Sequence, residues 1–240
     1  MLYALTWPLM KGFMRLIFAL TGGFHAHGRE NVPKKGGVLI CPNHVCDADP
    51  PAVAVALPRD AWFMAKEDIF TIPVLGALAR HWHGFPIKRN TADRAALRRA
   101  EELLKAGEAV VIFPEGGGNA AATLQPLNPG ALMIALRAGV PVVPVALTNT
   151  HKVWPYGRVL PGRAGVPVGV TFGPPLDFSD LAGKRGAVEA ATQRLTETLA
   201  AMLDQPVPPG KPRRRDVEPP PFEASSPSPP CPLPSEGRGS

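Results

Sequence analysis

The chain has 240 residues, of which 45% are hydrophobic and 19% are charged. This length and composition fit one domain with a single hydrophobic core, and they exclude a chain that is disordered throughout. The formal net charge is +6. A basic protein attracts phosphate groups, such as those of lipid headgroups, coenzyme A or nucleic acid. The sequence has no zinc-finger spacing and no basic run interleaved with aromatic residues, so we do not expect nucleic acid as a partner.

The three cysteines, Cys41, Cys46 and Cys231, do not form a disulfide framework, and a reducing compartment suits them best. Cys41 and Cys46 flank His44, but their spacing matches no common zinc site, and no second group of ligands follows. We therefore expect neither a metal nor another bound cofactor.

The first twenty residues, MLYALTWPLMKGFMRLIFAL, are predicted to form an amphipathic helix. One face of the helical wheel carries Leu2, Leu5, Leu9, Phe13, Leu16 and Leu20. Lys11 and Arg15 lie on the opposite face, where they suit anionic lipid. No apolar run is long enough to cross a bilayer, so the pattern indicates a helix in the membrane interface, with Tyr3, Trp7 and Phe18 at the headgroup level.

The alternative for this segment is a helix that packs on the core of its own domain, divided into two short pieces by Pro8. A secretory signal does not fit, because its charges would precede its apolar run. Residues 1–23 are therefore predicted to be a membrane-associating segment in front of a globular domain at 24–204.

Short runs rich in β-branched and aromatic residues predict strands at 38–41, 61–65, 84–87, 109–113, 141–147 and 167–172. Helices are predicted between and after them, at 51–57, 70–80, 91–107, 130–138 and 187–203. Asn90 or Thr91 is the expected N-cap of the third of these helices, and Gly107 ends it. The alternation predicts an α/β fold, with a mostly parallel or mixed sheet covered by helices on both faces. Sites in such sheets form in the loops beyond the strand ends.

The C-terminal segment 205–240 is dense in Pro, Ser and Gly, and it has 12 of the 30 prolines. It has too few aliphatic residues to offset the entropy of ordering. We predict a disordered tail.

The stretch NHVCDAD, residues 43–49, joins a predicted strand to a predicted helix. Pro50 suits the first position of a helix, so His44 and Asp49 lie on the turn before it, where their side chains can meet. An aspartate bonded to one ring nitrogen fixes the histidine tautomer and leaves the other nitrogen free to take a proton from a hydroxyl. The pair is therefore a candidate general base without an enzyme nucleophile. The alternative is that Asp49 is only an N-cap and His44 only a hydrogen-bonded residue at a strand end.

Three further blocks follow this His-x4-Asp pattern: HGFPIKRN at 83–90, VIFPEG at 111–116 and VPVVPV at 140–145. In this order and spacing, the four blocks resemble those of the glycerolipid acyltransferase family, whose lysophosphatidate acyltransferases are best known. The similarity spans roughly residues 28–175. It implies that 24–204 is an acyltransferase domain.

The resemblance also implies roles. His44 would deprotonate the acceptor hydroxyl as it attacks an acyl thioester, and Asp49 would orient His44. Substrate-binding residues would be Gly84, Phe85, Ile87, Lys88 and Arg89 of the second block, and Glu115 and Gly116 of the third. Arg89 would bind a phosphate through its bidentate guanidinium, with Lys88 as a second charge.

The activity implied is transfer of a fatty acyl group from acyl-CoA or acyl carrier protein to 1-acylglycerol-3-phosphate, in phospholipid biosynthesis. The enzyme would be peripheral or monotopic on the cytoplasmic face of the membrane, and its partners would be the lipid surface, the acyl donor and the lysophospholipid acceptor.

Two departures from the family pattern concern the acceptor. After FPEG the chain reads GGGN, residues 116–119, where the family usually has a polar and a basic residue, and Asn128 stands where a lysine is common. The glycine run is either a cradle of backbone N–H groups for an anion or a flexible loop. The lost cations leave another lysolipid, such as a lyso-aminolipid, as an alternative acceptor, and a non-catalytic lipid-binding module as the more distant alternative.

Overall fold

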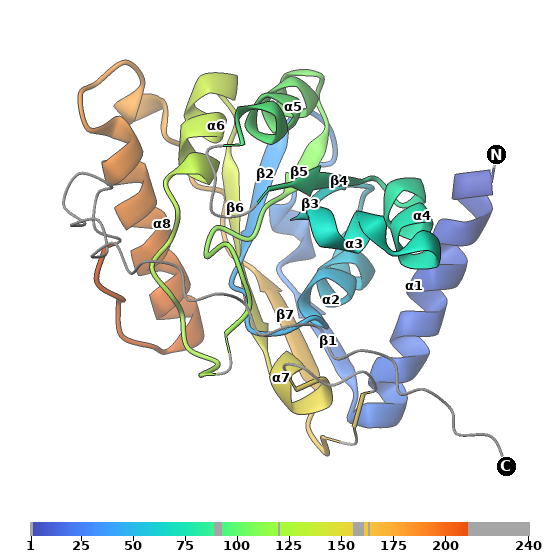
Figure 1. The fold of residues 1–240 in the computed structure, drawn as a ribbon. Helices are drawn as coiled ribbons and strands as arrows, with labels where there is room; N and C mark the ends of the chain where they lie inside the picture. The colour runs from blue at the N-terminus through green and yellow to red at the C-terminus, as the bar shows by residue number, and fades with distance from the viewer. Residues whose placement is uncertain (1, 89–92, 120, 156–160, 163, 211–240) are drawn as a thin grey trace, which may run out of the picture. The chain divides into compact units, whose positions relative to one another are not determined.

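A seven-stranded sheet lies at the centre of the computed structural model, which describes residues 2–88, 93–119, 121–155, 161–162 and 164–210 (Figure 1). The strands are β1 (Phe24–His27), β2 (Val38–Pro42), β3 (Trp62–Lys66), β4 (Gly84–Ile87), β5 (Ala109–Val111), β6 (Val142–Thr148) and β7 (Val168–Phe172), in the order β1-β7-β6-β2-β5-β3-β4. Strands β6, β2, β5, β3 and β4 are parallel, whereas β7 is antiparallel to β6 and parallel to β1. The loops that follow the five parallel strands therefore meet at one edge of the sheet.

Helices cover both faces of this sheet, which confirms the predicted fold class (Figure 1). They are α1 (Leu2–Thr21), α2 (Asp49–Ala56), α3 (Glu67–Thr71), α4 (Pro73–His81), α5 (Arg94–Lys105), α6 (Gly130–Ala138), α7 (Thr150–Val153) and α8 (Ala187–Leu203), with short 3-10 helices at Arg29–Asn31 and Ser179–Leu181. Helices α1 and α2 pack on one face, and α5, α6 and α8 pack on the other. Neighbouring residues of β2 contribute to different cores, Leu39 on the α5 side and Ile40 on the α2 side, because side chains alternate along a strand.

Two predicted helices differ most from the observed ones, one at its N-terminus and the other in being divided. Helix α5 is capped by Asp93, whose Oδ1 accepts a hydrogen bond from Ala96 N at 3.0 Å, so the expected cap at Asn90 or Thr91 was wrong. Those two residues lie outside the described part of the chain. The helix predicted at 70–80 is two helices, α3 and α4, because Pro73 starts a new helix and cannot continue an old one.

Helix α1 runs through Pro8 as one helix, so the division into two pieces, which belonged to the alternative for this segment, was wrong. Its inner side packs on the protein: Trp7 and Phe18 are buried, and the Tyr3 ring stacks on the His83 ring with centroids 4.2 Å apart. Trp7 and Phe18 are therefore packed within the protein, whereas the predicted place of this helix at the headgroup level stays a prediction.

The two cations of α1 also face the protein. Lys11 Nζ donates to Leu57 O at 3.2 Å, and Arg15 Nη2 donates to Val55 O at 3.4 Å. These carbonyls are at the C-terminal end of α2, where a helix favours positive charge. Both cations thus help to hold α1 on α2. Arg15 is nevertheless exposed, and the contact of Lys11 and Arg15 with anionic lipid stays a prediction.

The outer side of α1 is apolar and exposed. Five large side chains, Leu5, Leu9, Phe13, Leu16 and Leu20, are each 55–67% exposed. Among the helices of the described residues, none is both long enough and apolar enough to cross a bilayer.

The predicted tail begins at Gln205, but this residue contacts the domain. Gln205 Oε1 accepts a hydrogen bond from Leu124 N at 2.7 Å, and Nε2 donates to Ala122 O at 3.4 Å. The compact unit extends to Gly210. The remainder of the predicted tail, 211–240, lies outside the described residues.

Candidate active site

The turn between β2 and α2 is closed by the carboxylate of Asp49. Asp49 Oδ2 accepts hydrogen bonds from Val45 N at 2.6 Å and from Cys46 N at 2.8 Å. The N-cap of α2 is Ala48, and Asp49 is the first residue of the helix. The alternative in which Asp49 only caps the helix is therefore wrong, because its carboxylate points back into the turn.

The same oxygen meets the imidazole of His44, as the sequence predicted. His44 Nδ1 lies 2.9 Å from Asp49 Oδ2, with Asp49 fully buried and the His44 side chain 9% exposed. A carboxylate accepts hydrogen bonds and donates none, so Nδ1 carries the proton and the lone pair of the neutral ring is on Nε2. No described residue forms a hydrogen bond with Nε2. The ring packs on Phe113, which follows β5, with centroids 4.4 Å apart. This arrangement suits a general base.

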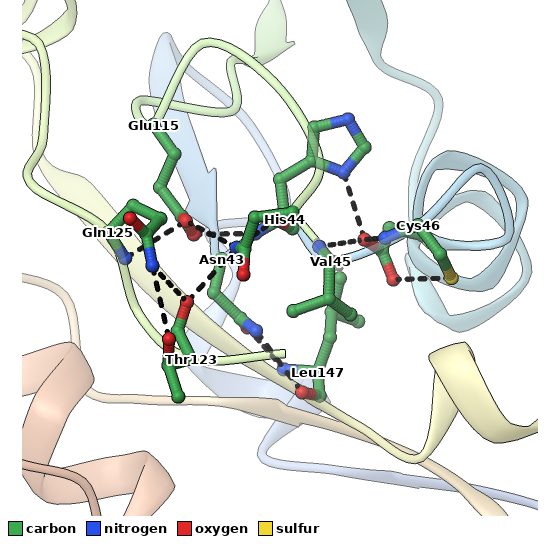
Figure 2. Close-up of polar contacts among 10 residues, drawn as sticks. Asn43, His44, Val45, Cys46, Glu115, Thr123, Gln125 and Leu147 are labelled. Atoms are coloured by element: carbon green, nitrogen blue, oxygen red, sulfur yellow. Dashed lines mark hydrogen bonds and ion pairs between the residues drawn. The ribbon is translucent and has the colours of Figure 1, made fainter. Parts of the chain in front are cut away.

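Glu115 holds the main chain of this turn. Its Oε1 accepts a hydrogen bond from His44 N at 2.7 Å, and its Oε2 accepts one from Gln125 N at 3.0 Å (Figure 2). Glu115 is buried. The structure thus brings Glu115 to His44, where it holds the His44 main chain. Contact of Glu115 with the acceptor stays a prediction. Nothing in the sequence pattern pointed to Gln125.

Gly116 and Asn128 form the turn that follows Glu115. Gly116 has a φ of +85°, and a Cβ there would lie 2.6 Å from Asn128 Nδ2. Asn128 Nδ2 donates to Glu115 O at 3.1 Å. Asn128, which stands where a lysine was expected, therefore supports the turn at Glu115. Position 116 requires glycine for two reasons, its positive φ and the lack of room for a Cβ.

The rest of the GGGN loop lies against the His44 turn. A Cβ on Gly118 would come within 3.3 Å of the Val45 carbonyl. Asn119 Nδ2 donates to His44 O at 3.3 Å and to Thr123 O at 3.0 Å. These contacts place the loop beside His44, and both interpretations of the glycine run stay predictions.

The second block forms β4 and the residues after it. Gly84 and Phe85 build the strand: a Cβ on Gly84 would lie 2.6 Å from Ala79 O, and Phe85 is buried in the core on the α5 side. Ile87 ends β4, half-buried. Lys88 follows at the same sheet edge as His44, with its backbone N donating to Asp93 Oδ2 at 2.9 Å and its Nζ 4.0 Å from Glu67 Oε2. Arg89 lies outside the described residues.

Cys46 contributes a thiol to the same network. Its Sγ lies 3.7 Å from Asp49 Oδ1. Burial, and then the charge of Asp49, raise the pKa of the Cys46 thiol to about 12, so it stays protonated and can donate to the carboxylate. Within the described ranges, no three His, Cys, Asp or Glu side chains are grouped as metal ligands would be.

A comparison with protein families matches residues 23–148 to the model described as "Acyltransferase". The chain belongs to this acyltransferase family. The match includes the His44–Asp49 turn, β4 and the Glu115 turn, so the family predicted from the four sequence blocks is confirmed.

Named relatives agree with this assignment. The acyltransferase is 31% identical, over 199 residues, to the 1-acyl-sn-glycerol-3-phosphate acyltransferase of Bacillus subtilis. This alignment covers 80% of this chain and 96% of the relative. It is 29% identical to the enzyme of the same name from Streptococcus pneumoniae, over 69% of this chain and 60% of that one. The crystal structure of the 1-acyl-sn-glycerophosphate acyltransferase PlsC from Thermotoga maritima superposes with a TM-score of 0.68 at 25% identity, covering 84% of this chain and 80% of that one.

Proposed function

We propose that this acyltransferase moves a fatty acyl group from the thioester of acyl-CoA or acyl carrier protein to the free hydroxyl of 1-acylglycerol-3-phosphate. The observation that carries the proposal is the 2.9 Å contact between His44 Nδ1 and Asp49 Oδ2 at the edge where the parallel strands end. The names of the relatives from Bacillus subtilis and Thermotoga maritima support the choice of acceptor.

In the proposed reaction, His44 Nε2 takes the proton of the acceptor hydroxyl as its oxygen bonds to the thioester carbonyl carbon. The tetrahedral intermediate then collapses, the carbon–sulfur bond breaks, and His44 returns the proton to the sulfur. The products are an ester and a free thiol. Asp49 remains ionised throughout and stabilises the imidazolium that forms between the two proton transfers. The thioester itself supplies the activation, so the proposal needs no metal or bound cofactor.

The acceptor phosphate is proposed to bind at the end of β4. Lys88 is exposed there, at the same sheet edge as His44. Arg89 would add a bidentate guanidinium, and Glu115 and Gly116 would border the glycerol. The GGGN loop would supply backbone N–H groups in place of the basic residue that the family usually has. The N–H of Gly116 would not be among them, because it donates to Phe113 O at 3.1 Å.

Acyl transfer to a panel of lysolipids tests the proposal. The protein is incubated with radiolabelled acyl-CoA, or with acyl carrier protein bearing the same acyl group, and with 1-acylglycerol-3-phosphate or a lyso-aminolipid. We expect labelled phosphatidate as the main product. If the labelled product is an aminolipid instead, the proposed acceptor is wrong and the proposed acyl transfer stands. If no lysolipid in the panel gives a labelled ester, both the acceptor and the acyl transfer are wrong.

We also propose that the enzyme works as a peripheral or monotopic protein on the cytoplasmic face of a membrane. The five exposed apolar side chains of α1 form what we call the exposed stripe of α1. Four more large apolar side chains are exposed on and before α4, at Ile72, Val74, Leu75 and Leu78, which are 37–74% exposed. The two helices touch through Thr6 Oγ1 and His81 Nε2, 2.6 Å apart. Apolar side chains on two adjoining helices form a surface that suits a lipid interface.

Binding to lipid vesicles is expected to depend on this stripe. Each large apolar side chain that enters lipid contributes about 1.5–3 kcal/mol, so the double substitution Leu9→Ser and Phe13→Ser should lower the vesicle partition coefficient more than about 10-fold. Sedimentation with vesicles measures it. Point variants are preferable to deletion of α1, because deletion would uncover the core that Trp7 and Phe18 fill.

Val207→Ser is the matched control, since Val207 is 46% exposed and lies outside both helices. This variant should sediment like the wild type. If the double variant also sediments like the wild type, the outer side of α1 is not the lipid-binding surface.

A further inference from the structure

The side chain of Asn43 continues the hydrogen bonding between β2 and β6 beyond the end of β2. Strand β2 ends at Pro42, which is paired with Val145 of β6, and Asn43 N donates to Val145 O at 3.3 Å. The next contacts are made by the side chain: Oδ1 accepts a hydrogen bond from Leu147 N at 2.7 Å, and Nδ2 donates to Leu147 O at 3.3 Å (Figure 2). Asn43 is buried, with 2% of its surface exposed.

This amide takes the place of a peptide group. In a parallel ladder, the backbone carbonyl of Asn43 would be the expected partner of Leu147 N. The side-chain amide offers the same acceptor and the same kind of donor, so β6 keeps its hydrogen bonds while the main chain leaves the sheet. Leu147 is itself buried, so without the amide its N–H would have neither a protein partner nor bulk water.

The main chain leaves the sheet just before the proposed base. His44 N turns away from β6 and donates to Glu115 Oε1 at 2.7 Å, on the side of β5. The His44 backbone is thus held from two sides, by Asn43, which bonds to β6, and by Glu115, which follows β5. Asp49 holds the imidazole ring.

We infer that Asn43 is a positioning residue for acyl transfer: its side chain stands in for a peptide group of β2 and so sets where His44 departs from the sheet. The inference rests on the proposed role of His44 as the base. Asparagine suits the position for a chemical reason. Aspartate has the same shape but no donor for Leu147 O, glutamine is one methylene longer, and alanine leaves both groups of Leu147 without their partner.

Asn43→Ala and Asn43→Asp test the inference, with acyl transfer from acyl-CoA to 1-acylglycerol-3-phosphate as the assay. A displacement of a catalytic group by about 1 Å lowers rates about 100-fold. We therefore expect kcat to fall about 10- to 100-fold in Asn43→Ala, with the KM of each substrate within about threefold of wild type. Rates are expressed per folded molecule, from the circular dichroism of the same sample.

Asn31→Ala is the matched control. Asn31 Nδ2 also donates to a distant backbone carbonyl, Phe172 O at 2.9 Å, but this bond lies on β7 and does not adjoin His44. It should lower the Tm without lowering kcat. If Asn43→Ala behaves in the same way, Asn43 only stabilises the fold and the inference is overturned. Should Asn43→Ala fail to fold, the isosteric Asn43→Asp decides by the same kcat comparison.

A double variant adds a readout that a purely structural role would not move. If Asn43 acts through His44, Asn43→Ala should have no further effect on the residual rate of a His44→Ala enzyme. An additional 10-fold loss in that background would overturn the inference. Failure of the proposed function is distinguishable, because it would show as wild-type enzyme without acyl transfer, or as transfer that does not depend on His44.

Discussion

Replacing His44 with alanine is expected to lower kcat for acyl transfer by about 10²- to 10⁴-fold, the range that a general base contributes. The ring nitrogen that receives the hydroxyl proton is lost, and no other described residue binds Asp49 Oδ2 through a side chain. The backbone of the turn keeps its bonds to Asp49 and Glu115, so the far-UV circular dichroism should be unchanged. Formation of labelled phosphatidate measures the rate.

His27→Ala is the control for this substitution, because His27 is an exposed histidine on β1. Its activity should equal that of the wild type. If His44→Ala retains activity within about threefold of wild type while folding normally, His44 is not the base, because general base catalysis contributes far more than that.

The part of the site that could be predicted from the sequence is the part made by neighbours in the chain. His44 and Asp49 are five residues apart on a turn, and the chemistry of the two side chains together with Pro50 was enough to place them in contact. The supports of the turn could not be predicted this way. Asn43 reaches Leu147 across 104 residues, and His44 reaches Glu115 across 71. No periodicity in either segment specifies such a partner.

The elements of the fold also differ in how well the sequence predicts them. Buried strands such as β2 and β6 have continuous apolar runs, and these runs predicted them. Strand β1, with the sequence FHAH, lies at the edge of the sheet and exposes both histidines, so it has no such run. Helix α1 has large apolar side chains on both sides. A helical wheel cannot tell that Trp7 and Phe18 face the core while Leu9 and Phe13 do not.

Two substitutions of Asp49 are expected to separate its two tasks, which are to orient His44 and to close the turn. Asp49→Asn keeps an oxygen for the backbone N–H groups of Val45 and Cys46 but loses the charge that stabilises the imidazolium. The same change in a Ser-His-Asp triad lowers kcat about 10⁴-fold. We therefore expect a loss of activity in Asp49→Asn similar to that of His44→Ala, with only a small loss of stability.

Asp49→Ala should lose stability as well as activity. It leaves the N–H groups of two buried residues, Val45 and Cys46, without an acceptor, at a cost of about 1–3 kcal/mol each. Urea unfolding measures this difference from Asp49→Asn. Asp180→Asn is the control: it breaks an exposed ion pair with Arg194, and because exposed ion pairs contribute little to stability, both the urea midpoint and kcat should stay close to wild type. If Asp49→Asn transfers acyl groups at the wild-type rate, the only task of the Asp49 carboxylate is to close the turn, and His44 acts without the negative charge of Asp49.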